Sequence, residues 1–294
     1  MKIKGKSGIS LKTVGIISAV LFGLLFVIRL YHTFALTDSA TGFFTENNFT
    51  VILMYILAVG SVIAVCIFSY ICSDLPSGDM KKKPSLFYTA AGFLFALTLL
   101  YDGIKNILII VGTKGSFNII KEAVGGNIGL LSTVFALFGA FTVFAATVIY
   151  VKSGTLTGKL KIPMLFPVIW AFLETLGFFS VTVSYVKVSQ LLLSIFFTAF
   201  LMVFLFENAR VTTGVGRQDA LWFFYASGII TAGLALSSGV PLFLANLFAP
   251  EKLISYTPFE LYTLGGGIYA LASMLVRAGV KEKTEEENIV TENE

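Results

Sequence analysis

Eight long apolar stretches, separated by short polar segments, make up most of the chain. Apolar runs of about 18 or more residues are typical of transmembrane helices, because about 20 helical residues cross a hydrocarbon core about 30 Å thick. No polar segment between the stretches is long enough for a soluble domain. The pattern therefore predicts an all-α, polytopic membrane helix bundle with about eight spans, at 13–35, 50–72, 85–102, 128–151, 163–186, 190–207, 220–239 and 259–278.

Composition narrows the class of protein further. Of the 294 residues, 56% are hydrophobic and 13% are charged, whereas soluble domains carry about 25% charged residues. A free cytoplasmic enzyme is therefore excluded. The net charge of +4 comes from basic residues spread over short loops, so nucleic-acid binding is not indicated. His32 is the only histidine and the two cysteines, Cys66 and Cys72, are badly spaced, so we expect no metal site, no cofactor and no catalytic residues, which argues against an enzyme.

Basic residues indicate the orientation of the spans. Short cytoplasmic loops retain more Lys and Arg than translocated loops do. With the N-terminus inside, the outer segments hold only four basic residues, namely Lys114, Lys121, Lys187 and Lys252. The inner segments hold fifteen, namely Lys2, Lys4, Lys6, Lys12, Lys81, Lys82, Lys83, Lys152, Lys159, Lys161, Arg210, Arg217, Arg277, Lys281 and Lys283. Both termini are therefore predicted to face the cytoplasm.

The two ends of the chain need separate interpretations. Lysines followed by an apolar run also fit a signal peptide, but Arg29 follows the run and no small-x-small cleavage site precedes Thr37. We therefore interpret 13–35 as a helix. Residues 279–294 are acidic and lack apolar periodicity, which predicts a disordered cytoplasmic tail after a transmembrane domain at 1–278.

The third and seventh spans resemble each other. Each contains two glycines eleven residues apart, followed by a further apolar segment: Gly92, Gly103 and 104–111 in one, and Gly228, Gly239 and 240–248 in the other. These segments could be re-entrant or lie flat at the interface. One interpretation is a duplication into halves 1–152 and 153–278, related as parallel repeats. The other is that apolar segments resemble one another by composition alone.

A family resemblance adds to this interpretation. Arg29, Leu30 and Tyr31 at the end of the first span, with Thr41 and Gly42 in the following loop and the eight-span plan, resemble an uncharacterised family of eight-helix bacterial multi-pass membrane proteins. The resemblance implies a bacterial cytoplasmic membrane. It implies no activity and transfers no site residues.

Glu174 is the first candidate for a functional residue. It lies near the middle of its span, where a carboxylate cannot reach the interface and a charge costs about 2.5–3.5 kcal/mol. One interpretation is a carboxylate that binds a proton or cation and faces a cavity between helices. The other is a protonated Glu that is hydrogen-bonded to a neighbouring helix and has a structural role alone.

Arg29, near the outer end of the first span, is the second candidate. It could pair with Asp102 or Glu174 or bind an anionic substrate group. Its long side chain could also reach the outer headgroups, which would explain it without a partner. His32 lies closer to the interface, where we expect an interfacial role.

Polar residues after the third span have two interpretations. Asp102, Lys105 and Asn106 share one face if the helix continues through Gly103. The simpler expectation is that the helix ends at Asp102 with Gly103 as its C-cap, which places Lys105 near the headgroups.

The seventh span is interrupted in a similar place. Ser238 and Gly239 precede Pro241, which removes a backbone donor. Paired interruptions in two halves point to a transporter binding site, and here they favour an outward-facing vestibule. Three further charged residues at span ends are expected to be solvated, namely Glu207, Arg210 and Glu260.

The sequence supports two classes of function. The first is a small-solute or ion transporter with an outward-opening polar cavity, lined by Glu174, Arg29 and Asp102. The second is a non-transporting scaffold, complex subunit or sensor. Lipids are the expected partners in both classes, with a solute or ion in the first and a second copy or another membrane protein in the second. A solid core around Glu174 would favour the second class.

Overall fold

The computed structural model describes residues 8–36, 49–72, 75–76, 85–115, 117–153, 160–180, 188–214, 221–250 and 260–278. Within these ranges the chain is helical apart from short connections and one isolated β-bridge, between Ile9 and Cys72. The all-α prediction is thereby confirmed. The predicted tail at 279–294 lies outside the described residues, as do many of the inner lysines.

The helices are joined by short connections and by π- or 3-10 turns. In chain order they are α1 (Leu11–Tyr31), η1 (His32–Leu36), α2 (Phe49–Tyr70), α3 (Leu86–Gly112), α4 (Phe117–Ala123), α5 (Gly126–Ser153), η3 (Pro163–Leu165), α6 (Phe166–Ser180), α7 (Val188–Thr212), α8 (Leu221–Leu234), η6 (Ala235–Gly239), α9 (Val240–Phe248) and α10 (Leu261–Ala278).

Six helical stretches in the described part of the chain are long and apolar enough to cross a membrane. They are Leu11–Leu36, Phe49–Tyr70, Leu86–Gly112, Gly126–Ser153, Leu191–Thr212 and Leu221–Phe248. A seventh apolar helix, Pro163–Phe179, is shorter. These are the helices of an integral membrane protein, because an apolar helix satisfies its own backbone hydrogen bonds in lipid. The count of eight spans stays a prediction.

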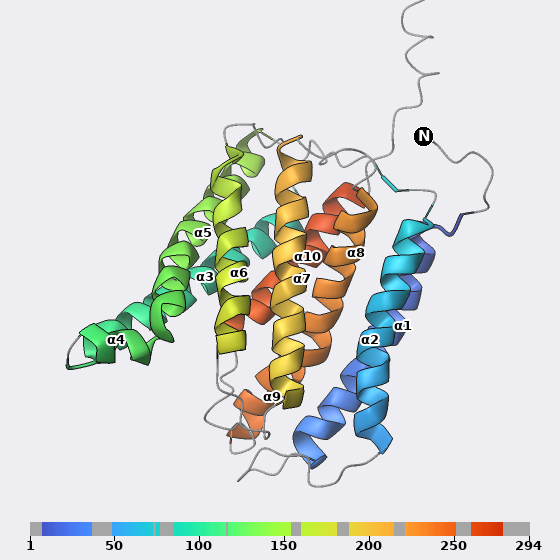
Figure 1. Ribbon diagram of the computed structural model, residues 1–294. Helices are drawn as coiled ribbons and strands as arrows, with labels where there is room; N and C mark the ends of the chain where they lie inside the picture. Colours follow the sequence, from blue (N-terminus) through green and yellow to red (C-terminus); the bar gives the residue numbers. More distant parts are fainter. Residues whose placement is uncertain are drawn as a thin grey trace, which may run out of the picture.

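Six helices form a closed ring through pairwise packing. α3 packs on α5, α5 on α6, α6 on α7, α7 on α8, α8 on α10, and α10 again on α3. Figure 1 shows α6 and α7 in front, with α3 and α10 crossing obliquely behind them. α1 and α2 pack on each other and against α8, so they flank this ring.

Aromatic side chains fill the centre of the ring. Phe95 of α3 stacks on Tyr269 of α10, with ring centroids 5.2 Å apart, and the edge of Trp170 of α6 approaches Phe95 at 6.4 Å. Phe204 of α7 packs edge-on against Tyr269 at 6.3 Å. We call these four buried residues the aromatic layer. Such ring pairs hold neighbouring helices in one register.

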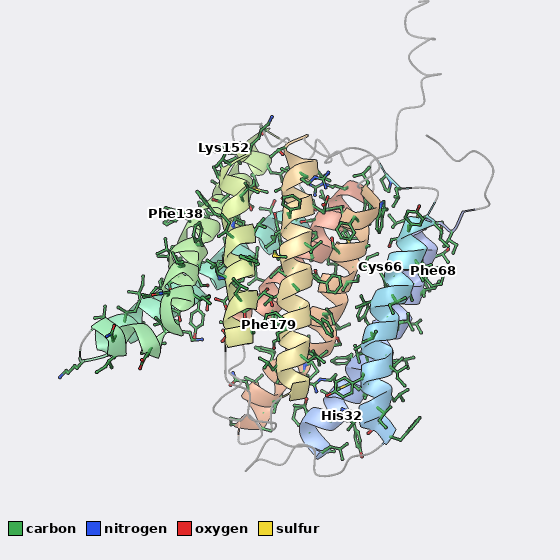
Figure 2. The ribbon with its side chains drawn as sticks, viewed as in Figure 1. His32, Cys66, Phe68, Phe138, Lys152 and Phe179 are labelled. Atoms are coloured by element: carbon green, nitrogen blue, oxygen red, sulfur yellow. The ribbon has the colours of Figure 1, made fainter. Side chains whose placement is uncertain are left out.

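The outer surface of the bundle is apolar. Phe138 of α5 and Phe179 of α6 are 51% and 69% exposed, and Figure 2 shows Phe138 at the left edge of the bundle and Phe179 near the lower end of α6, in front. Large exposed apolar surfaces are unfavourable in water, and a lipid environment removes this cost. Figure 2 also places Lys152 and His32 at opposite ends of the bundle.

Three consecutive glycines allow α10 to approach three neighbours closely. A Cβ atom at Gly265 would lie 2.5 Å from Thr98 Oγ1 of α3, and one at Gly267 would lie 2.1 Å from Ala235 Cβ of η6. A Cβ at Gly266 would contact α7. Small residues at helix contacts permit such close backbone packing in membranes.

The helix boundaries correct two expectations. The third helix does not end at Asp102 with Gly103 as its C-cap, because α3 continues to Gly112 and thus includes 104–111. Gly103 instead packs against Leu137 of α5, so its missing side chain serves helix contact. The segment 240–248 likewise continues the preceding helix, through the π-turn η6, and is part of the stretch Leu221–Phe248. Neither segment is therefore a separate outer element.

The predicted interruption before Pro241 appears as this π-turn. Ser237 Oγ donates to Gly233 O at 2.9 Å, and Ser238 Oγ donates to Leu234 O at 2.5 Å. Pro241 occupies the first turn of α9, where a missing N–H is tolerated.

The glycines that suggest a duplication occupy comparable positions. Gly92 and Gly103 of α3 both face α5, and Gly228 and Gly239 both face α10. In each case the helix packs through its two glycines on the next long helix of the chain. The duplication into two halves nevertheless stays a prediction, because two helices are compared and not eight.

Candidate functional site

Four ionisable side chains from three places in the chain lie close together. Asp102 and Lys105 come from the middle of α3, Glu174 comes from α6, and Glu260 immediately precedes α10. Asp102, Lys105 and Glu260 all act electrostatically on Glu174. We call these four residues the acidic cluster. It therefore brings together three of the sequence candidates, Glu174, Asp102 and Lys105.

Glu174 faces the neighbouring helices. Ser132 of α5 donates a hydrogen bond to its Oε1 atom. Trp170 lies four residues earlier on α6, so both side chains are on the same face of the helix. A membrane-buried carboxylate that is directed into the protein avoids contact with lipid tails.

Asp102 is the most deeply buried member, with 6% of its surface exposed. Trp170 Nε1 donates to Asp102 Oδ2 at 3.3 Å. The ring of Tyr262, from the first turn of α10, packs edge-on against Trp170 at 5.0 Å. The indole therefore joins the acidic cluster to the aromatic layer in the centre of the ring.

Lys105 and Glu260 form an ion pair between α3 and the start of α10. Lys105 Nζ lies 3.3 Å from Glu260 Oε1 and 3.4 Å from Oε2. The two side chains are 32% and 22% exposed, so this side of the cluster is the more accessible one. Because α3 continues past Gly103, Lys105 lies about one helical turn after Asp102 on the same helix.

The charges of the cluster do not balance. Three carboxyl groups share one ammonium group, which leaves an excess of two negative charges if all are ionised. Charges of one sign within a low-dielectric bundle repel strongly. In the described part of the chain, no three His, Cys, Asp or Glu residues are arranged to hold a metal ion.

The remaining sequence candidates lie elsewhere. Arg29 is buried between α1 and α2, where Nη1 contacts Met54 Sδ at 3.8 Å. Ser238 bonds to its own helix, and Gly239 packs against Thr263 of α10. The π-turn that holds Ser238 and Gly239 packs on both α1 and α10. Asn106 is partly buried on α3.

His32, for which we expect an interfacial role, has a partner on a neighbouring helix. It is fully buried, and its Nε2 atom lies 3.1 Å from Thr50 Oγ1 of α2. Figure 2 shows it at one end of the bundle between α1 and α2. It therefore links the two flanking helices.

Sequence reasoning missed several residues of the site. Trp170 could have been found from its spacing of four residues to Glu174. Glu260 was expected to be solvated, yet it is paired with Lys105 in the cluster. Glu207, also expected to be solvated, is 3% exposed and pairs with Arg210 at 2.7 Å. Ser132 has no signal in the sequence, because serine is common in membrane helices.

Comparisons with protein-family models, with curated proteins and with solved structures gave no match.

Proposed function

We propose that this protein is a small-solute or ion transporter in which the acidic cluster binds and releases protons. The observation that carries the proposal is the grouping of three carboxyl groups and one lysine within a membrane bundle: Lys105 is ion-paired with Glu260, and Asp102 accepts a hydrogen bond from Trp170, about one helical turn before Glu174. Intramembrane ionisable groups are costly, and in membrane proteins they mark proton and substrate pathways. The proposal includes a bacterial cytoplasmic membrane with both termini in the cytoplasm.

Glu174 has the central role in this mechanism. When it is ionised, it adds a negative charge beside Asp102 and Glu260, and only Lys105 opposes it. Uptake of a proton removes this repulsion, and release of the proton restores it. Proton binding at Glu174 therefore changes the attraction between α6 and the α3–α10 pair, which is the coupling that a transport cycle needs.

The test measures charge movement by the full-length protein. Proteoliposomes are adsorbed on a solid-supported membrane, and a rapid pH step is applied, followed by a panel of small solutes. We expect transient currents for the wild type and a loss of at least about tenfold for Glu174→Gln, because the amide cannot exchange a proton. Retained currents in this variant would remove Glu174 from the mechanism.

Glu207→Gln is the matched control. It makes the same change at another buried glutamate, which belongs to an ordinary ion pair with Arg210. We expect this variant to keep its currents. Folding of both variants is checked by a single symmetric elution peak from size-exclusion chromatography, so that loss of current is separated from loss of protein.

The alternative, a non-transporting scaffold, subunit or sensor, is favoured by the aromatic layer that fills the centre of the ring. A filled centre provides a rigid platform for other helices. Absence of current in the folded wild type, with every solute and pH step, would favour this function.

A further inference from the structure

A second group of polar side chains lies at the other end of the α3–α10 pair. Tyr88 is in the first turn of α3, Asn208 is in the last turns of α7, and Arg277 is in the last turn of α10. Tyr269 of α10 and Tyr225 of α8 complete the group. We call these five residues the arginine–tyrosine cluster. Each is no more than 2% exposed.

Arg277 is the charged member. Its Nη2 atom donates to Thr212 Oγ1 at 2.7 Å, and its Nη1 atom donates to Ser273 O at 3.3 Å. The guanidinium lies over the ring of Phe224, 5.0 Å from the centroid. Tyr225 packs edge-on against the same Phe224, with ring centroids 5.2 Å apart, so its ring lies next to the one under the guanidinium.

Two of the tyrosines have one hydrogen-bond donor in excess. Asn208 Nδ2 donates to Tyr269 Oη at 3.2 Å, and Tyr269 Oη lies 3.4 Å from Tyr88 Oη. Each hydroxyl has one hydrogen to donate. Only one of the two hydroxyl hydrogens can be used in the bond between Tyr88 and Tyr269. The other hydroxyl hydrogen has no acceptor among the hydrogen bonds described for these two side chains.

Two further hydroxyl groups near Arg277 are in a similar situation. Tyr225 Oη and Ser273 Oγ are buried without a hydrogen-bond partner among the described residues. Ser273 lies one helical turn before Arg277 on α10. Buried polar groups are nearly always paired with protein, water or a bound ion, so each of these donors calls for a partner.

We propose that the arginine–tyrosine cluster binds a small anion, with the size of a carboxylate or a halide. Hydroxyl donors gathered around a guanidinium lack an acceptor, and an anion supplies several acceptor sites at once. The enclosed position limits the ligand to a small one. On the basis of the proposed function, this anion, or an anionic group of the substrate, is transported together with the protons of the acidic cluster.

The test is a thermal unfolding titration of the purified full-length protein in detergent, with sodium chloride or sodium acetate as the probe. Tyr225→Phe removes a hydroxyl that has no hydrogen-bond partner within the described ranges, so no described hydrogen bond is lost. We expect either anion to raise the unfolding temperature of the wild type. In the variant, about tenfold more anion should be needed for the same rise.

Ser61→Ala is the matched control. It removes another buried hydroxyl, from the middle of α2, for which the described part of the chain likewise offers no hydrogen-bond partner. This variant should titrate like the wild type. General salt effects act on all three proteins alike, so a difference confined to Tyr225→Phe reports the site.

The two probes separate the sources of the anion. Stabilisation by acetate but not chloride supports a carboxylate on the substrate, and the reverse supports a free halide ion. Identical titrations of wild type and Tyr225→Phe would overturn the anion site. Proton currents that persist without any dependence on these anions would refute the coupling between the anion and the protons, but would leave the proposed transport intact. Binding without currents would keep the site and refute transport.

Discussion

Removal of the positive charge of Lys105 should destabilise the bundle more than removal of the negative charge of Glu260. The two groups are ion-pair partners, so an isolated pair would lose the same interaction in either case. The acidic cluster breaks this symmetry. Lys105→Met leaves three carboxyl groups facing one another, whereas Glu260→Gln leaves two carboxyl groups and the lysine.

The magnitude follows from the distances and the exposure. At the observed 3.3 Å and an effective dielectric constant of about 20, the pair attracts by about 5 kcal/mol. Solvent screening and side-chain entropy reduce the measurable value to about 1 kcal/mol for partly exposed groups. Lys105→Met also loses the attraction of the lysine to Asp102 and to Glu174, which costs about 1 kcal/mol for each. Glu260→Gln instead removes the repulsion between Glu260 and these two carboxyl groups, which gains about 1 kcal/mol for each. We expect a loss of about 3 kcal/mol for the first variant and a change of about 1 kcal/mol or less for the second.

The assay is equilibrium or thermal unfolding of both single variants and the double variant in one detergent, at a pH where the wild-type cluster is partly ionised. The double variant should fall between the two single variants, because loss of Glu260 relieves part of the repulsion that loss of Lys105 exposes. Equal destabilisation by the two single variants would refute the electrostatic coupling within the acidic cluster. Lys105 and Glu260 would then form a simple ion pair.

Two further predictions concern packing and topology. Gly267→Ala should destabilise the fold by about 1–3 kcal/mol, because the new methyl group would overlap the Cβ atom of Ala235; Gly23→Ala, at a site with open space, should be neutral or slightly stabilising in the same unfolding assay. In a cysteine-free background, an impermeant thiol reagent should label Lys152→Cys from the cytoplasmic side of the membrane and Gly115→Cys from the outer side. Labelling of both from one side, or from the reversed sides, would contradict the predicted orientation.

The helical character of the chain could be predicted because it depends on local properties. At six of the eight predicted positions the structure has helices that are long and apolar enough to cross a membrane. Boundaries were less predictable. Gly103 looks like a helix cap in the sequence, but the apolar residues after it continue α3, and the glycine contacts α5.

The candidate site was predicted in part. Glu174 and Asp102 stood out because a charge within an apolar run is rare and costly. Glu260 and Glu207 did not stand out, because both lie at the ends of apolar runs, where water is the ordinary environment. Their burial depends on how far neighbouring helices extend, and the sequence of one helix does not contain that information.

The amino-acid sequence by itself determined that this is a helical membrane protein, because long apolar segments must leave water and must satisfy their backbone hydrogen bonds internally. Only the tertiary structure decided which polar residues meet. Lipid is as apolar as the interior of the bundle, so hydrophobicity does not select the partners of a membrane helix. Shape selects them, through contacts such as those of the glycines of α10, and these contacts bring α3, α6 and the start of α10 together around the acidic cluster.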